Sequence, residues 1–198
     1  ILGPYGAGKS TLLNLIGGMD TPTMGSIKID GEEISKYNEN KLSEYRAENI
    51  GFIFQFYNIL PTLTVLENVE LIKDVVKEGT DSKEAIKAVG LEKHMNKFPS
   101  QLSGGEQQRV SIARAIAKKP EIFIYDDSFS ALDLKTDAIL RKELAANVSD
   151  ATVIIVAQRI STILHADQIL VMDDGKIVGK GTHEELMKTC ETYQQIAS

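Results

Sequence analysis

The feature that most restricts the fold is a glycine-rich segment near the start of the chain, Gly3-Pro4-Tyr5-Gly6-Ala7-Gly8-Lys9-Ser10. It matches G-x-x-x-x-G-K-[ST], with strand-like residues before it and a helical run, Thr11–Ile16, after it. In that setting the glycines let N–H groups point at phosphate oxygens, and the helix N-terminus adds partial positive charge. Lys9 is expected to reach the β- and γ-phosphates, and the Ser10 hydroxyl to bind Mg²⁺. The segment therefore predicts a nucleotide-binding loop over residues Gly3 to Thr11.

Strand-like runs recur between helical patterns along the rest of the chain, at Ile50–Phe54, Ile122–Tyr125, Thr152–Val156 and Gln168–Met172. Strands spaced in this way by helices predict a mostly parallel sheet that is flanked by helices. We also expect an antiparallel edge strand at Ser26–Asp30 and a hairpin turn at residues 173–176. The predicted fold is one α/β domain of the P-loop NTPase type over residues 1–198. Because residue 1 falls at the end of a strand pattern, a further strand or two is expected to precede it.

Residues from about Val65 to Phe98 differ from the rest, because their apolar side chains recur at helical spacing without any strand pattern. We interpret this stretch as a helical lobe inserted into the α/β core and place the helical subdomain at about residues 60–118. Nearer the C-terminus, Thr182-His183-Glu184-Glu185 has the spacing of a capping box. It predicts that the last helix begins at Thr182.

Two acidic residues follow one of the buried strand patterns, with Asp126 at the end of Ile122–Tyr125 and Asp127 next to it. At the carboxyl edge of a parallel sheet, Asp126 can bind Mg²⁺ through its water shell. Asp127 stands where an ATPase would place its general base. Two acids after a strand are more often the start of a polar loop, but the phosphate loop upstream favours the functional interpretation.

The segment Leu102-Ser103-Gly104-Gly105-Glu106-Gln107-Gln108-Arg109 indicates a second anion site. Ser103 and Glu106 have capping-box spacing, which predicts a helix from about Gly104 to Ala117. The two glycines keep the helix start bare enough for a phosphate to approach, which a merely well-capped surface helix would not require. A second site of this kind makes sense if it serves a nucleotide that is held by another subunit.

Composition narrows the class of protein. The 22 Lys+Arg and 28 Asp+Glu give a net charge of −6, which argues against a nucleic-acid binder that works by general phosphate attraction. No apolar stretch approaches the roughly 18 residues that a membrane span needs. The single cysteine, Cys190, excludes a disulfide framework, suits a reducing compartment and is expected to be a half-buried structural residue.

In this order the motifs resemble those of the ATP-binding subunits of ABC transporters, over essentially all 198 residues. The resemblance implies ATP and Mg²⁺ as ligands, with Ser10, Gln55 and Asp126 at the metal and Gln55 also at the nucleotide. The corresponding motifs are the Walker A loop Gly3–Ser10, the Q-loop glutamine Gln55, the signature Leu102–Gln108, the Walker B acid Asp126 and the D-loop Ser130-Ala131-Leu132-Asp133.

The resemblance also implies two protein partners and no nucleic acid. In a head-to-tail dimer of ATP-binding domains, each ATP would lie between one chain's Walker A loop and the other chain's signature, Ser103 to Glu106. Closure on ATP and reopening after hydrolysis would drive a transmembrane domain at the cytoplasmic face of the cell membrane. That domain would contact the helical lobe near Gln55, and it would choose the transported substrate.

Two of the expected catalytic residues depart from the family's pattern, while the third, Lys9, follows it. The family has a glutamate base where this chain has Asp127, whose carboxylate reaches roughly 1.5 Å less far toward an attacking water. The family has a histidine at the γ-phosphate where this chain has Gln158, which donates a hydrogen bond but cannot carry a proton. This pattern, with the signature intact, resembles the degenerate half of a heterodimeric exporter. Conservative variation in a slow homodimer is the alternative.

Two halves of the chain resemble different branches of the family. Residues 1 to about 108 resemble the lipoprotein-releasing and macrolide-export ATPases, and residues from about 110 onward resemble multidrug exporters whose ATPase is fused to the membrane domain. Three functions therefore stay open. They are the energy-coupling ATPase of an exporter, a regulatory half that scarcely hydrolyses ATP, and, ranked last, a non-transport ATPase of the same family.

An apolar run that begins within the strand pattern Ile50–Phe54 and continues beyond it supplies more aromatic surface than one buried strand needs. It comprises Phe52, Phe54, Phe56, Tyr57, Ile59 and Leu60. It either docks a membrane-domain partner near Gln55–Ile59 or packs the helical lobe against the core, and the sequence favours neither interpretation clearly.

Overall fold

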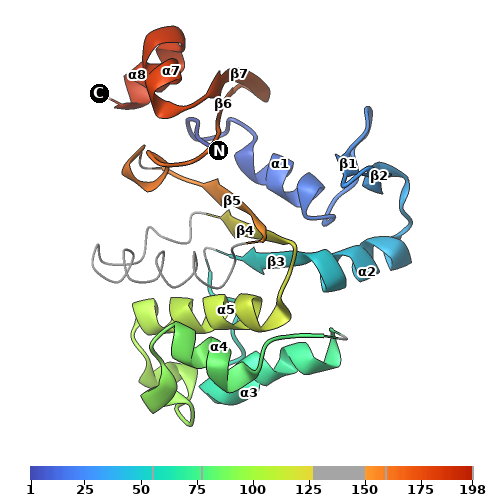
Figure 1. The fold of residues 1–198 in the computed structure, drawn as a ribbon, viewed down its shortest axis with the longest axis vertical. Helices are drawn as coiled ribbons and strands as arrows, with labels where there is room; N and C mark the ends of the chain where they lie inside the picture. The colour runs from blue at the N-terminus through green and yellow to red at the C-terminus, as the bar shows by residue number, and fades with distance from the viewer. Residues whose placement is uncertain (55, 77, 127–149, 159, 198) are drawn as a thin grey trace. The chain divides into compact units, whose positions relative to one another are not determined.

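The computed structural model describes residues 1–54, 56–76, 78–126, 150–158 and 160–197. The chain forms two compact units. We call Ile1–Lys36 with Ile154–Ser198 the terminal unit, and Tyr37–Val153 the middle unit. Figure 1 shows the elements of both units.

The terminal unit is built around the short strand-like segment Ile1–Leu2. Its backbone pairs on one side with the end of β5 (Thr152–Val156), where the Ile1 nitrogen donates to the Ile155 carbonyl at 2.6 Å. On the other side Leu2 pairs in parallel with β6 (Ile169–Asp173), since its N–H donates to the Leu170 carbonyl at 2.9 Å. The phosphate loop therefore leaves a strand whose neighbours on both sides run in its own direction.

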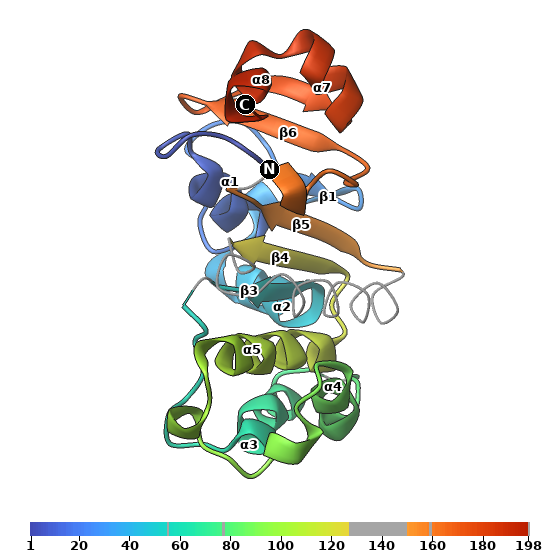
Figure 2. The same cartoon turned by 90° about the vertical axis from the view of Figure 1, so that its left-hand side faces the viewer.

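The remaining elements of the terminal unit are two hairpins and several helices. Strands β6 and β7 (Lys176–Gly181) pair antiparallel through the predicted turn, and α7 and α8 lie against them in both views (Figures 1 and 2). The other elements are α1 (Lys9–Ile16), β1 (Lys28–Ile29), β2 (Glu32–Glu33), η1 (Ile34–Lys36), η5 (Ile160–Thr162), α7 (His183–Thr189) and α8 (Glu191–Ala197).

Three details of the terminal unit differ from the sequence predictions. The edge strand expected at Ser26–Asp30 is shorter, because only Lys28 and Ile29 pair with β2 before the turn. Thr182 is the N-cap of α7, as predicted, but a further helix, α8, follows it. Cys190 is buried rather than half-buried, because it packs with Leu186 and Tyr193 in the core of this unit.

The middle unit combines a parallel strand pair with a helical lobe. Strands β3 (Ile50–Ile53) and β4 (Ile122–Asp126) pair in parallel from Ile50 opposite Ile122 to Ile53 opposite Tyr125, and the strand order is β3-β4-β5. The helices are α2 (Glu39–Asn49), α3 (Val65–Glu70), η2 (Leu71–Asp74), α4 (Ser82–Ala88), η3 (Glu92–His94), η4 (Pro99–Gln101) and α5 (Gly104–Lys118).

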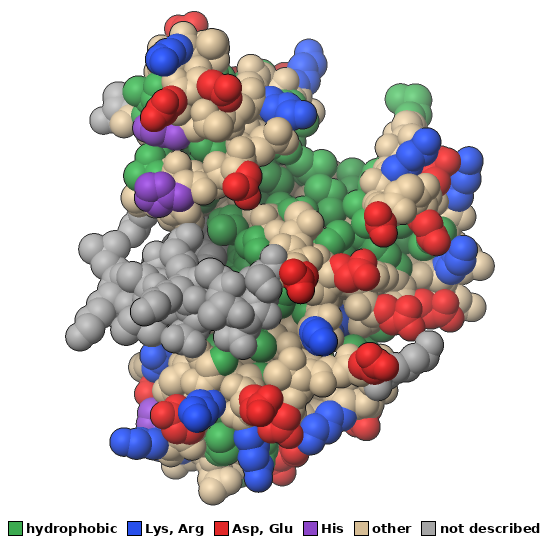
Figure 3. All heavy atoms as spheres, in the orientation of Figure 1, with side chains coloured by type: hydrophobic (Ala, Val, Ile, Leu, Met, Phe, Trp, Pro, Cys, Tyr) green, Lys and Arg blue, Asp and Glu red, His purple; other side chains and the backbone are tan. Residues whose placement is uncertain are grey.

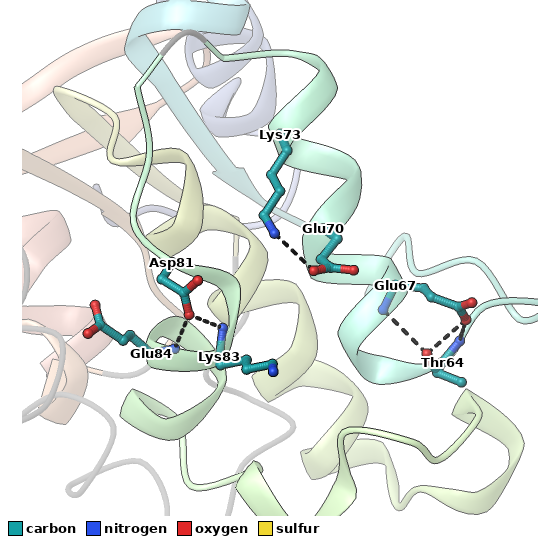
Figure 4. Close-up of polar contacts among 7 residues, drawn as sticks. All are labelled: Thr64, Glu67, Glu70, Lys73, Asp81, Lys83 and Glu84. Carbon is teal, nitrogen blue, oxygen red and sulfur yellow. Dashed lines mark hydrogen bonds and ion pairs between the residues drawn. The ribbon is translucent and has the colours of Figure 1, made fainter.

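Helix α5 organises the lobe, because it contacts β3 on one side and both α3 and α4 on the other (Figure 1). Local caps define the other helices: Thr64 and Glu67 form a capping box at α3, and the Asp81 carboxylate accepts the N–H groups of Lys83 and Glu84 at α4 (Figure 4). Acidic and basic side chains are interspersed on the face of the lobe that Figure 3 shows. The lobe carries no strand among its described residues, as its periodicity predicted.

A buried amide, Asn68, connects α3 to the loop before it. Its Oδ1 accepts the Leu60 N–H at 2.8 Å, and its Nδ2 lies 3.0 Å from the carbonyls of Leu60, Leu63 and Thr64. Full burial of an amide is tolerated because these backbone groups satisfy it. Asn68 lies on the apolar face of the predicted helix, and its role was not predicted.

The α/β class, with a parallel sheet, antiparallel hairpins and flanking helices, is confirmed. All four predicted strand runs are present, as β3, β4, β5 and β6. The assignment of residues 1–198 to one domain with a helical subdomain at about 60–118 stays a prediction. Within the described residues, no helix is both long enough and apolar enough to span a bilayer.

Candidate nucleotide site

The phosphate loop has the backbone of an anion site. Gly8 is the N-cap of α1 with φ of +92°, and this cap residue supplies no side-chain hydrogen bond to the helix. The first turn also contains no acidic residue, so nothing of the helix's own neutralises the partial positive charge of its N-terminus. Leu13 anchors the helix in the core, where it is fully buried. The N-terminus of α1 therefore remains available to bind phosphate.

Lys9 is folded back over this loop. Its Nζ lies 2.7 Å from each of the carbonyl oxygens of Gly3 and Pro4, so the cation bridges the start of the loop. Tyr5 is fully exposed at the tip, whereas Ala7 is buried beneath it. The predicted residues Gly3 to Ser10 thus form one loop in which a cation and a bare helix N-terminus coincide. This is a chemical environment for a phosphorylated, negatively charged ligand.

Gln158 lies at the same edge of the terminal unit's sheet as this loop. It follows β5 and Ala157, whose N–H donates to the Ile1 carbonyl at 3.1 Å. Because β5 and the Ile1–Leu2 segment are parallel, the residues that follow each of them leave at the same end of the sheet. Gln158 is exposed there. This placement is compatible with the position predicted for it, and its catalytic role stays a prediction.

Asp126 is the last residue of β4 and is half-buried. It ends a strand whose four preceding residues are buried, which is the environment that the apolar run predicted. Ser10 belongs to the terminal unit and Asp126 to the middle unit. The predicted site residues Gln55, Asp127 and Asp133 lie outside the described residues, and their roles stay predictions.

The predicted signature helix is present with its cap. Ser103 is the N-cap of α5, its hydroxyl accepts the Glu106 N–H at 3.3 Å, and the Glu106 carboxylate accepts the Ser103 N–H at 2.7 Å. These hydrogen bonds hold the pKa of Glu106 below its ordinary value; His94, whose Nδ1 lies 3.3 Å from the carboxylate, and Arg109 lower it further. The helix start is thus built by the two residues that the sequence singled out.

The structure adds a second reason for one of the signature glycines. A Cβ at Gly104 would come within 2.9 Å of the Tyr57 hydroxyl, so the phenol occupies the space that a side chain would need. The motif's glycine had been attributed only to the approach of a phosphate. Sequence reasoning missed this contact because Tyr57 and Gly104 are distant in the chain and only the fold brings them together.

The apolar run divides into half-buried and exposed members. Phe52 and Phe54 stack on each other with ring centroids 4.2 Å apart, and Tyr57 and Ile59 are half-buried. Phe56, Leu60 and, from a distant segment, Phe98 remain exposed at 79%, 46% and 43%. Of the two interpretations, packing within the middle unit accounts for part of the run, and the exposed apolar surface is confined to a few side chains.

Comparison with known proteins shows which family this chain resembles. Residues 1–130 match the family model described as ABC transporter. The uncharacterized ABC transporter ATP-binding protein YknY of Bacillus subtilis is 40% identical over 186 residues, which are 90% of this chain and 80% of that protein. The methionine import ATP-binding protein MetN 1 of Pseudomonas savastanoi pv. phaseolicola is 42% identical over 190 residues, 91% of this chain but 56% of the relative.

Solved structures that are similar to this chain also belong to ABC proteins. The dimeric ABC cassette MJ0796, also seen in a post-hydrolysis state bound to ADP and Pi, is similar with a TM-score of 0.84 and 37% identity over 91% of this chain and 83% of that one. A bacterial Atm1-family ABC exporter with ATP bound gives a TM-score of 0.86 at 31% identity, over 98% of this chain and 35% of that one. These proteins thus include one named as an importer and one named as an exporter.

The Glu106 carboxylate yields a prediction of pH-dependent stability. Glu106→Ala removes the acceptor of the Ser103 N–H, so at pH 7 the free energy of unfolding should fall by about 1 kcal/mol. Because the pKa of Glu106 is lowered on folding from its usual 4.5, the carboxylate stabilises the protein above pH 4.5, and this contribution is lost as the pH falls below it. In urea unfolding, the difference in free energy of unfolding between the wild type and Glu106→Ala should therefore be smaller at pH 4 than at pH 7. Glu44→Ala, at an exposed position in the interior of α2, is the control. An equal difference between wild type and Glu106→Ala at both pH values would contradict the prediction.

Proposed function

The chain belongs to the ABC transporter ATP-binding family, and we propose that it binds Mg·ATP and couples its binding and hydrolysis to transport by a membrane-domain partner. The observation that carries this proposal is the phosphate loop, in which Lys9 and the bare N-terminus of α1 form one anion site. A loop of this shape supplies binding and electrostatic stabilisation, which are the main contributions that a protein makes to phosphoryl transfer.

The roles proposed for the residues follow from their chemistry. Gly3 to Thr11 hold the phosphates through N–H groups, and Lys9 moves from the loop carbonyls to the β- and γ-phosphate oxygens. Oxygen donors suit Mg²⁺, and Ser10, Asp126 and Gln55 provide a hydroxyl, a carboxylate and an amide. When bound, Mg²⁺ neutralises charge that develops on the phosphates.

Lys9→Ala tests the binding proposal. The variant loses the cation that faces the β- and γ-phosphates, so binding of a fluorescent ATP analogue in the presence of Mg²⁺ should be abolished. Lys28→Ala, which removes an exposed lysine from β1, is the matched control and should bind as the wild type does. Unchanged nucleotide affinity in Lys9→Ala would refute the assignment of the loop.

We propose that two such domains act together. The start of the signature helix would face the ATP held by the Walker A loop of a second chain. It consists of the capping box of Ser103 and Glu106 and the two glycines between them, Gly104 and Gly105. This partner is either a second copy or a related chain, and Asp133 in the D-loop would lie at their contact. The similarity to the dimeric cassette MJ0796 supports this arrangement.

The membrane partner is proposed to dock on the exposed apolar side chains of the middle unit. Phe56, Leu60 and Phe98 are large and apolar, yet each is more than two-fifths exposed. Exposed aromatic side chains of this kind are typical of interfaces. We also propose that the chain lies at the cytoplasmic face of the membrane, which the resemblance to ABC transporters implies, and that it energises export. The resemblance of residues 110 onward to exporters supports that direction.

A photo-crosslinker at position 56 tests this docking. In membranes it should capture a transmembrane chain, whereas a crosslinker at the exposed position Glu44 on α2 should not. The captured chain, reconstituted in vesicles with this one, is expected to move substrate away from the side that carries the ATP domain. Position 56 capturing no more than position 44 would contradict the docking surface, and movement toward the ATP side would contradict export.

Asp127 and Gln158 are proposed to make this chain a slow ATPase on its own. The shorter Asp127 carboxylate reaches less far toward the attacking water. The Gln158 amide can donate a hydrogen bond to the γ-phosphate but cannot carry a proton, so both residues weaken activation of the water. Well-placed general-base catalysis contributes on the order of 10²- to 10⁴-fold. The alternative form of the proposal is that the chain is the regulatory half of a heterodimer, whose partner has the glutamate and the histidine.

Restoring both residues tests the degenerate-site interpretation. Asp127→Glu together with Gln158→His should raise phosphate release at saturating Mg·ATP by at least about 10-fold. Either change alone should recover less, because both groups act on the same water and γ-phosphate. The double variant that also carries Lys9→Ala is the blank. If the wild type already hydrolyses ATP as fast as the repaired variant, the degenerate-site interpretation is wrong.

A further inference from the structure

The turn between β6 and β7 lies directly against the phosphate loop. Within the terminal unit, the Gly175 N–H donates to the Ala7 carbonyl at 3.2 Å. A side chain at Gly8 would meet the Gly175 Cα at 3.5 Å and the Met172 Cε at 3.6 Å, and one at Gly3 would collide with the Met172 carbonyl. Two glycines of the nucleotide motif are thus in contact with the hairpin. The nucleotide motif and the hairpin are more than 150 residues apart in the sequence.

The hairpin is irregular at the place where it meets the loop. The register of β6 and β7 shifts between Val171 and Met172, and the Met172 N–H pairs with Leu2 at 2.8 Å. A register shift of this kind changes the direction of a strand. The register shift therefore lies next to Met172, the residue of the hairpin that contacts both Gly3 and Gly8.

The hydrogen bond from Gly175 has a consequence for phosphate binding. A peptide unit is planar and trans, so its C=O and N–H groups point in opposite directions. When the Ala7 carbonyl is held toward Gly175, the Gly8 N–H of the same peptide must point away from the turn. Rotation of that peptide would direct a carbonyl oxygen, instead of an N–H, toward a bound phosphate.

From these contacts we propose that the β6–β7 turn is a positioning element for nucleotide binding. The inference rests on the proposed binding of ATP. Gly175 fixes the orientation of the Ala7–Gly8 peptide, so that the Gly8 N–H is available to phosphate. Gly175 itself does not touch the nucleotide. It sets the affinity by determining how the loop is shaped before the nucleotide arrives.

The chain contains its own matched control. The β1–β2 turn in the same unit has φ of +48° at Asp30 and +82° at Gly31, close to +44° at Asp174 and +72° at Gly175. At both glycines an added side chain would meet no atom within 4 Å, so a substitution at either acts through the backbone. In the described part of the chain, the Asp30–Gly31 turn makes no hydrogen bond to the phosphate loop.

The experiment compares Gly175→Val, Gly175→Asn and Gly31→Val. Valine strongly disfavours a positive φ, whereas asparagine tolerates it. Dissociation constants are measured for a fluorescent ATP analogue with Mg²⁺, and stability by urea unfolding. Gly175→Val should weaken binding roughly 10-fold, as expected when one hydrogen bond to a charged group is lost. Gly175→Asn should retain most of the affinity, and Gly31→Val should lose similar stability but bind as the wild type does.

Each outcome bears on the inference. Equal affinities of Gly175→Val and the wild type would overturn it, as would an equal loss of affinity in Gly31→Val. If Gly175→Val does not fold, Gly175→Ala and Gly31→Ala are compared with the same criteria. A wild type that binds no more nucleotide than Lys9→Ala would overturn the proposed function, and this inference with it. Wild-type binding with no difference between the two turns would overturn the inference alone.

Discussion

The pairing of Ile1 and Leu2 between β5 and β6 is the constraint on which the terminal unit depends. The four backbone hydrogen bonds of these two residues, between 2.6 and 3.1 Å, hold the strand from both sides. The chain therefore enters the phosphate loop from a fixed position and in a fixed direction. The loop, Gln158 and the β6–β7 turn all follow strands that end at one edge of the sheet. A loop attached to a less restrained strand would lose conformational entropy when it bound phosphate.

The two proposed anion sites of the chain differ in how they are built. At α1 the N-cap is a glycine with positive φ, and the helix N-terminus is left without a side-chain cap. At α5 the N-cap is Ser103, and Glu106 completes a capping box. An acidic residue beside a bound phosphate would be unfavourable, but the Glu106 carboxylate faces back to the Ser103 N–H and His94. The first site can bind an anion with its own lysine, whereas the second is a well-ordered helix start that presents two glycines.

Prediction from the sequence was most accurate where the physics is local. Capping boxes involve residues three apart, so the boxes at Ser103 and Thr182 could be identified from spacing alone, and the structure contains both. Strand runs and the turn at residues 173–176 were found for the same reason. Helix α8 was missed because its short segment has no such signature, and Tyr193 holds it through burial in the core. Asn68 was missed because only its four backbone contacts distinguish it from an exposed asparagine.

By itself the sequence determined the fold class, the identity of the phosphate loop and the order of the motifs, because each depends on residue types at short, fixed spacing. Tertiary structure alone decided what surrounds those motifs. It placed the Tyr57 hydroxyl over Gly104 and the β6–β7 turn beneath Gly3 and Gly8. Both are contacts between distant segments, and they depend on how strands and helices pack rather than on local preference. Glycines that are needed for a ligand and glycines that are needed for a neighbouring backbone look identical in a sequence, and only the packing distinguishes them.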